Sequence, residues 1–109
     1  MKNVLVFSLA LLVVATIPAW GAGKADAAAG KVLYASKCAS CHGAAGEGKD
    51  SIAKALKVEL RNLGSKDVQA KTDAALKKDT VEGIGKMKGV KLTDDEAANV
   101  LAILRTLAK

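Results

Sequence analysis

Two cysteines and one histidine stand together at Cys38, Cys41 and His42, and the chain has no other residue of either type. Thiols and imidazole bind metals, exchange disulfides or attach a cofactor. A thioredoxin-like redox pair places C-x-x-C at the start of a helix in a βαβ setting, and no strand pattern is found here. A structural zinc site needs four ligands, whereas this motif supplies three. A simple disulfide would leave His42 without a role.

The spacing C-x-x-C-H over residues 38–42 is also the signature of covalent haem attachment. Two thiols three residues apart on a tight turn can reach the two vinyl groups on one edge of a porphyrin. The adjacent imidazole can then reach the iron from one face. This interpretation uses all three residues, so we predict one covalently bound haem c per chain, held by Cys38 and Cys41, with His42 as an iron ligand.

A haem iron with one histidine ligand needs a second axial ligand or stays open. A second histidine is excluded within the chain, and Met87 is the only methionine after Met1. Most methionines fill gaps in a hydrophobic core. The segment 83–89, GIGKMKG, has three glycines and two lysines around the methionine and does not suit such a position. We therefore predict that Met87 is the second axial ligand.

The elements that must position these residues are predicted to be helical. Residues 93–96, TDDE, match the capping box that opens a helix, and an apolar stripe then runs to the C-terminus. No segment alternates as a strand, so the fold class is all-α. A domain this small commonly needs a cofactor or another staple to complete its core. The expected elements are a helix over 27–37, a loop over 43–50, helical spacing over 51–60, a helix opened by Thr72 as N-cap and running to about 78, an irregular stretch around Met87, and the last helix.

The N-terminal residues have the pattern of a secretory signal peptide, with a charged start, a short apolar run over 4–17 and a small-residue exit. The run is shorter than the roughly 20 residues that span a bilayer, which disfavours the alternative of an uncleaved anchor. Small residues permit cleavage after Gly21 or as late as Ala27. We therefore predict a signal peptide over 1–21, possible cleavage up to 27, a mature domain over 28–109, and a periplasmic location without stable membrane insertion.

The sequence resembles the class I mono-haem c-type cytochromes, of the small bacterial periplasmic kind. The residues that carry this resemblance are GKVLY at 30–34 leading into CASCHG at 38–43, GKM at 85–87, and LTDDE at 92–96 running to LRTL at 104–107. The resemblance implies a cytochrome c fold with three to five short helices around the haem. It also implies crossing first and last helices with Gly30 at the close approach, His42 as proximal and Met87 as distal ligand, and a one-electron Fe(III)/Fe(II) cycle.

Three positions depart from that family pattern. Lys88 follows the methionine where the family usually has proline, which predicts a looser loop. No proline downstream of His42 offers a carbonyl to the imidazole, so the partner of its second nitrogen is unnamed. The last helix has Ile103 where an aromatic residue is usual, so packing against the first helix would rest on Tyr34 and aliphatic side chains.

These observations predict an electron carrier rather than an enzyme. The chain has a net charge of +6, which becomes +5 once Lys2 leaves with the predicted signal peptide. This charge suits redox partners with an acidic docking surface, although scattered lysines are equally typical of an ordinary solvated face. Neither a nucleic-acid partner nor an oligomer is expected. The alternative is a haem c protein with a labile sixth ligand that acts as a peroxidase or a small-gas sensor. The sequence fits both a mobile carrier and a dedicated subunit that serves one larger enzyme. The lysines around the methionine loop outnumber the acidic residues of the same segment, which are Asp73, Asp79 and Glu82. These lysines are Lys71, Lys77, Lys78, Lys86, Lys88 and Lys91.

Overall fold

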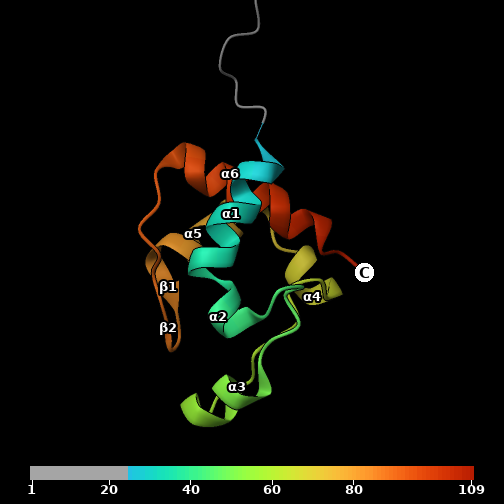
Figure 1. Cartoon of the computed structure of the whole chain (residues 1–109), viewed down its shortest axis with the longest axis vertical. Coiled ribbons are helices and arrows are strands. Elements are labelled where there is room, and N and C mark those ends of the chain that lie inside the picture. Colours follow the sequence, from blue (N-terminus) through green and yellow to red (C-terminus); the bar gives the residue numbers. More distant parts are fainter. Residues whose placement is uncertain (1–24) are drawn as a thin grey trace, which may run out of the picture.

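A computed structural model of the chain describes residues 25–109 and is dominated by two crossing helices, α1 (Ala27–Lys37) and α6 (Asp94–Thr106) (Figure 1). The Asp26 carboxylate caps α1 by accepting hydrogen bonds from the next turn. Thr93 and Glu96 form the complete capping box at the start of α6. Both helices begin where the sequence predicts. The predicted signal peptide lies outside the described residues.

The crossing of α1 and α6 brings their backbones into direct contact at Gly30. A Cβ atom at this position would lie 1.9 Å from the Asn99 carbonyl oxygen, so only glycine permits the approach. The centre of the resulting core consists of Tyr34, Val100 and Leu104. This arrangement confirms the predicted helix pairing, with Tyr34 as the aromatic member and Ile103 only partly buried beside it.

The remaining helices are short, and the structure has six in the described residues, against the three to five predicted. Two of the six are single turns, and α4 was not predicted at all. Its N-cap Ser65 accepts a hydrogen bond from Val68 N–H, so the capping residue was a signal that sequence reasoning missed. The four helices between α1 and α6 are α2 (Ala39–His42), α3 (Asp50–Leu56), α4 (Lys66–Gln69) and α5 (Asp73–Glu82).

The bounds of α3 and α5 differ from those predicted. Helix α3 ends at Leu56, several residues before the predicted end, because Lys57 adopts a left-handed conformation with φ of 53°. Helix α5 starts after its predicted N-cap Thr72 but continues to Glu82, where Gly83 ends it with φ of 88°. Apolar spacing alone did not locate these ends, because local backbone conformation decides them.

The glycine-rich stretch around Met87 is a small antiparallel hairpin rather than irregular chain. Strands β1 (Gly83–Ile84) and β2 (Met87–Lys88) pair Ile84 with Met87. The turn between them uses Gly85 at φ of 57°, a conformation that suits glycine. Two-residue strands carry no alternating pattern long enough to read from sequence, which explains why no strand was predicted.

Arg105 of α6 ties the segment between α4 and α5 to the last helix. Its guanidinium donates to the backbone carbonyls of Gln69 and Lys71, at 2.8 Å each, and to the Asp73 carboxylate at 2.8 Å. Charge-assisted bonds to several fixed acceptors make this fork a specific clamp. Within residues 25–109, no helix combines the length and the apolar character that crossing a membrane requires.

Candidate functional site

Cys38, Cys41 and His42 meet on one turn, as predicted. Cys38 ends α1 and caps α2, and its carbonyl oxygen accepts hydrogen bonds from Cys41 N–H at 3.2 Å and His42 N–H at 2.9 Å. All three side chains are half-buried, and neither thiol is in a disulfide. The two sulfur atoms and the imidazole are therefore presented together from a tight helical turn.

Tyr34 fixes the backbone just after this turn. Its buried hydroxyl donates a 2.6 Å hydrogen bond to the Gly43 carbonyl oxygen, and Gly43 has a φ of 82°. Burial, followed by the nearby Cys38 and Glu47, raises the pKa of the phenol, so it stays a donor at neutral pH. The sequence indicated that Tyr34 packs inward, but it did not reveal this polar contact, which joins α1 to the residue following His42.

The His42 side chain has the chemistry of a metal ligand. Burial lowers its pKa, which favours the neutral ring that carries a free lone pair. Its Nδ1 atom is buried and has no hydrogen-bond partner in the described residues, in agreement with the missing proline carbonyl noted above. Burial also raises the pKa of the Cys38 thiol, so this residue is held as the neutral thiol rather than the thiolate.

Met87 lies on β2, far along the chain from the cysteine turn. Its side chain is half-buried, whereas the neighbouring Lys86 and Lys88 are exposed. One hydrogen bond links the hairpin to α3, since Lys86 Nζ donates to the Leu56 carbonyl oxygen at 2.7 Å. The cysteine turn is linked to the segment leading into α3, because Gly48 N–H donates to the His42 carbonyl oxygen at 2.6 Å. Both parts of the predicted site are thus joined to the same segment.

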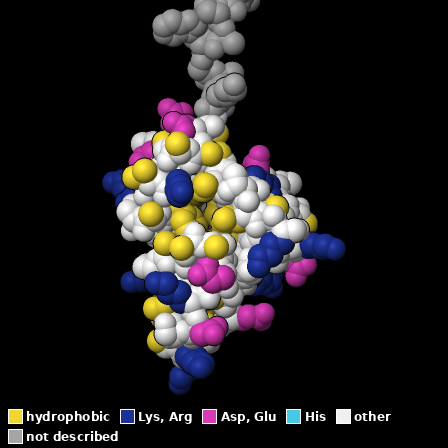
Figure 2. All heavy atoms as spheres, turned by 45° about the vertical axis from the view of Figure 1, so that its right-hand side comes forward, with side chains coloured by type: hydrophobic (Ala, Val, Ile, Leu, Met, Phe, Trp, Pro, Cys, Tyr) yellow, Lys and Arg dark blue, Asp and Glu magenta, His cyan; other side chains and the backbone are white. Residues whose placement is uncertain are grey.

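The core of the described residues is incompletely covered by apolar side chains. Many aliphatic side chains around the core are only partly buried, and Figure 2 shows apolar side chains gathered around a recess in the upper body of the molecule. An incompletely covered apolar surface with a few polar groups is what a flat organic cofactor requires. Two unpaired thiols and an imidazole on one turn are the groups that covalent attachment of haem c requires, so the residues of this turn fit that cofactor. The buried apolar residues are Tyr34, Val68, Leu76, Ala97, Val100 and Leu104.

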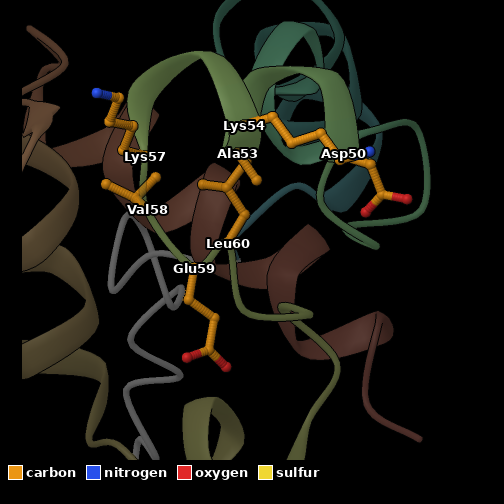
Figure 3. Close-up of a pocket in the computed structure, with 7 residues that line it drawn as sticks. All are labelled: Asp50, Ala53, Lys54, Lys57, Val58, Glu59 and Leu60. Carbon is orange, nitrogen blue, oxygen red and sulfur yellow. The ribbon is translucent and has the colours of Figure 1, made fainter.

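A separate open pocket of about 510 Å³ lies on α3 and the three residues that follow Lys57. Figure 3 shows that charged side chains of both signs surround it, and it includes none of the predicted site residues. Its mixed charge and open shape do not suit an apolar cofactor. The residues that line it are Asp50, Ala53, Lys54, Lys57, Val58, Glu59 and Leu60.

Three comparisons with known proteins agree with this geometry. The family model described as cytochrome c matches residues 27–108. The chain is 37% identical to a protein named cytochrome c6 from Picosynechococcus sp. (strain ATCC 27264 / PCC 7002 / PR-6), over 100% of this chain and 97% of that protein. It also resembles the solved structure of the KustC0563 c-type cytochrome, with a TM-score of 0.62 and 27% identity over 73% of this chain and 98% of that one.

Proposed function

The chain belongs to the cytochrome c family, and from this premise we propose that it carries single electrons between redox proteins through one covalently attached haem c. When bound, haem c supplies one-electron exchange between Fe(III) and Fe(II). The observation that carries the proposal is the turn that holds Cys38, Cys41 and His42 together, with two unpaired thiols and a half-buried imidazole whose Nδ1 atom has no partner in the described residues.

Each residue of the site has a proposed task. Cys38 and Cys41 anchor the cofactor through thioether bonds, and His42 binds the iron as proximal ligand. The bond from Tyr34 to Gly43 holds the backbone beside that ligand, which restricts how the imidazole can turn. Met87 would supply the second protein ligand of the iron through its thioether sulfur. Histidine and methionine ligation raises the reduction potential and excludes outside ligands, which suits a carrier better than a peroxidase or a gas sensor.

Exposed lysines near the methionine hairpin support docking to an acidic partner. Lys71 is paired with Asp79 at 2.8 Å and Lys77 with Asp94 at 2.7 Å, so part of the predicted positive charge is neutralised locally. The exposed lysines of this group without an acidic partner in the described residues are Lys78, Lys86, Lys88 and Lys91, and Lys86 donates instead to the Leu56 carbonyl oxygen. Unpaired charge of one sign around an electron-transfer site speeds encounter with a partner of opposite sign.

Export to the periplasm is part of the proposal, and the cap of α1 bears on the cleavage point. Cleavage after Ala27 would remove Asp26, which caps the helix and whose N–H donates to Asn99 Oδ1 at 2.8 Å. Losing a helix cap costs about 1 kcal/mol. Cleavage after Gly21 keeps both contacts and is the site we favour. The mass of the exported chain is the check, and a chain starting at Ala28 would contradict this choice.

The optical spectrum of the holoprotein tests the function, together with CO binding by the reduced form. We expect a haem c spectrum with low-spin iron and slow CO uptake. Met87→Ala should open the axial position and permit rapid CO binding. Ile84→Ala is the matched control, because Ile84 pairs with Met87 in the ladder but is exposed, and it should behave as wild type. Rapid CO binding by the wild-type protein would favour the peroxidase or sensor alternative instead.

A further inference from the structure

Helix α3 and its flanking loops form a lobe, residues 46–63, that projects from the body of the molecule (Figure 1). The lobe is closed at its base by a hydrogen bond from Leu63 N–H to the Gly46 carbonyl oxygen at 2.8 Å. It is joined to the cysteine turn by bonds from Gly48 to His42 and from Lys49 to Cys41. No residue of α3 itself is buried, so the far end of the lobe has little packing to hold it in place.

One side chain from a distant part of the sequence reaches this far end. Lys86, in the turn of the β1–β2 hairpin, donates a hydrogen bond from its ammonium group to the Leu56 carbonyl oxygen, with an N to O distance of 2.7 Å. This is the one hydrogen bond between the hairpin and the lobe in the described residues. The acceptor is well placed for a cation, because Leu56 is the last residue of α3 and carbonyls at a helix C-terminus attract positive charge.

The hairpin has few other constraints at its tip. Its base is held where Val90 N–H donates to the Thr80 carbonyl oxygen at 2.8 Å. Its strands have two residues each, and a hairpin this short has little stability of its own. The tether at Lys86 therefore restrains the hairpin at the position directly before Met87.

We propose that Lys86 is a positioning residue: its bond to Leu56 latches the methionine hairpin to the α3 lobe and slows the replacement of Met87 by outside ligands. The proposal rests on the proposed ligation of the haem iron by Met87. When the latch is broken, the hairpin and the lobe can separate more often, and the thioether leaves the iron more readily. Lys86 then acts through the backbone of its neighbour and does not itself contact the iron.

Imidazole binding to the ferric holoprotein tests the latch, because imidazole must displace the methionine. We expect Lys86→Ala to bind imidazole about two- to fivefold faster than wild type, the range that one exposed charge-assisted contact can produce. Lys86→Arg keeps a cationic donor and should stay close to wild type. Lys88→Ala is the matched control. It removes the lysine on the other side of Met87, and in the described residues Lys88 makes no hydrogen bond to the lobe. Equal rates in the two alanine variants would overturn the proposal.

Two further measurements distinguish the latch from a general loosening of the fold. High salt should narrow the difference between Lys86→Ala and wild type, because the contact is exposed and screened. The denaturant midpoint of Lys86→Ala should stay near that of wild type, and faster binding that tracks a general loss of stability would contradict the latch. The methionine-to-iron charge-transfer band of the wild-type protein tests the ligation itself. If this band is absent, both proposals fail, and if it is present while Lys86→Ala binds imidazole like wild type, only the latch fails.

Discussion

Replacing Gly30 with alanine sets two physical effects against each other at the crossing of α1 and α6. Alanine is the better helix former, and glycine within a helix costs about 1 kcal/mol relative to alanine. Judged by α1 alone, Gly30→Ala should therefore stabilise the protein. At the crossing, however, the added Cβ would meet Asn99 O at 1.9 Å and Asn99 C at 2.5 Å. Both atoms belong to the backbone and cannot rotate away.

The size of the effect follows from this distance. Real Cβ contacts essentially never fall below 3.0 Å, so the helices must part by at least about 1 Å, the difference between 3.0 and 1.9 Å. A gap of this size loses a quarter to a half of the dispersion energy across the contact, and Tyr34, Val100 and Leu104 lie in that interface. Forcing an extra methyl group into a well-packed interface typically costs up to about 3 kcal/mol. After the propensity gain, the net loss should be about 2 kcal/mol.

Denaturant unfolding of the holoprotein, followed by far-UV circular dichroism, measures this loss directly. For a domain of this size, about 2 kcal/mol corresponds to a fall in Tm of about 8 to 16 °C. Ala35→Gly is the matched control, because Ala35 lies on α1 and is exposed, so it should lose only the propensity difference of about 1 kcal/mol. If Gly30→Ala unfolded at the same or a higher denaturant concentration than wild type, the close approach would not govern this interface.

Two other predictions concern charge. The Glu96 carboxylate accepts a hydrogen bond from Thr93 in the capping box, which lowers the pKa of Glu96 below its ordinary 4.5. The stability that this carboxylate contributes is present above pH 4.5 and is lost as the pH falls through the lowered pKa, so the stability of Glu96→Gln should depend less steeply on pH below about pH 4.5. An unchanged dependence of stability on pH would contradict the role of the capping box. Lys78→Glu and Lys88→Glu should each slow electron exchange with an acidic redox protein by about two- to threefold at low salt and by much less at high salt. Lys31→Glu, on the exposed side of α1, is the control and should leave the rate unchanged. Electron-exchange rates that do not depend on ionic strength in any of the three variants would refute docking by these lysines.

Much of the site could be predicted because it depends on neighbouring residues. The cysteine turn is specified within five positions, so Cys38, Cys41 and His42 meet wherever a helical turn forms. The start of α6 depends on Thr93 and Glu96, which contact each other within one turn. The family comparison confirms the haem c that this turn predicted, while the ligation by Met87 stays a prediction.

What the tertiary structure decided involves atoms that are distant in sequence. The phenol of Tyr34 had no visible acceptor in the sequence until α1 and the turn after His42 were folded together. The clamp from Arg105 to the α4–α5 segment and the bond from Lys86 to Leu56 end on backbone carbonyls. Every residue carries such a carbonyl, so no residue type marks the acceptor. The chain alone therefore specified the cysteine turn and the capping box that opens α6, and only the folded backbone determined which carbonyls the long polar side chains reach.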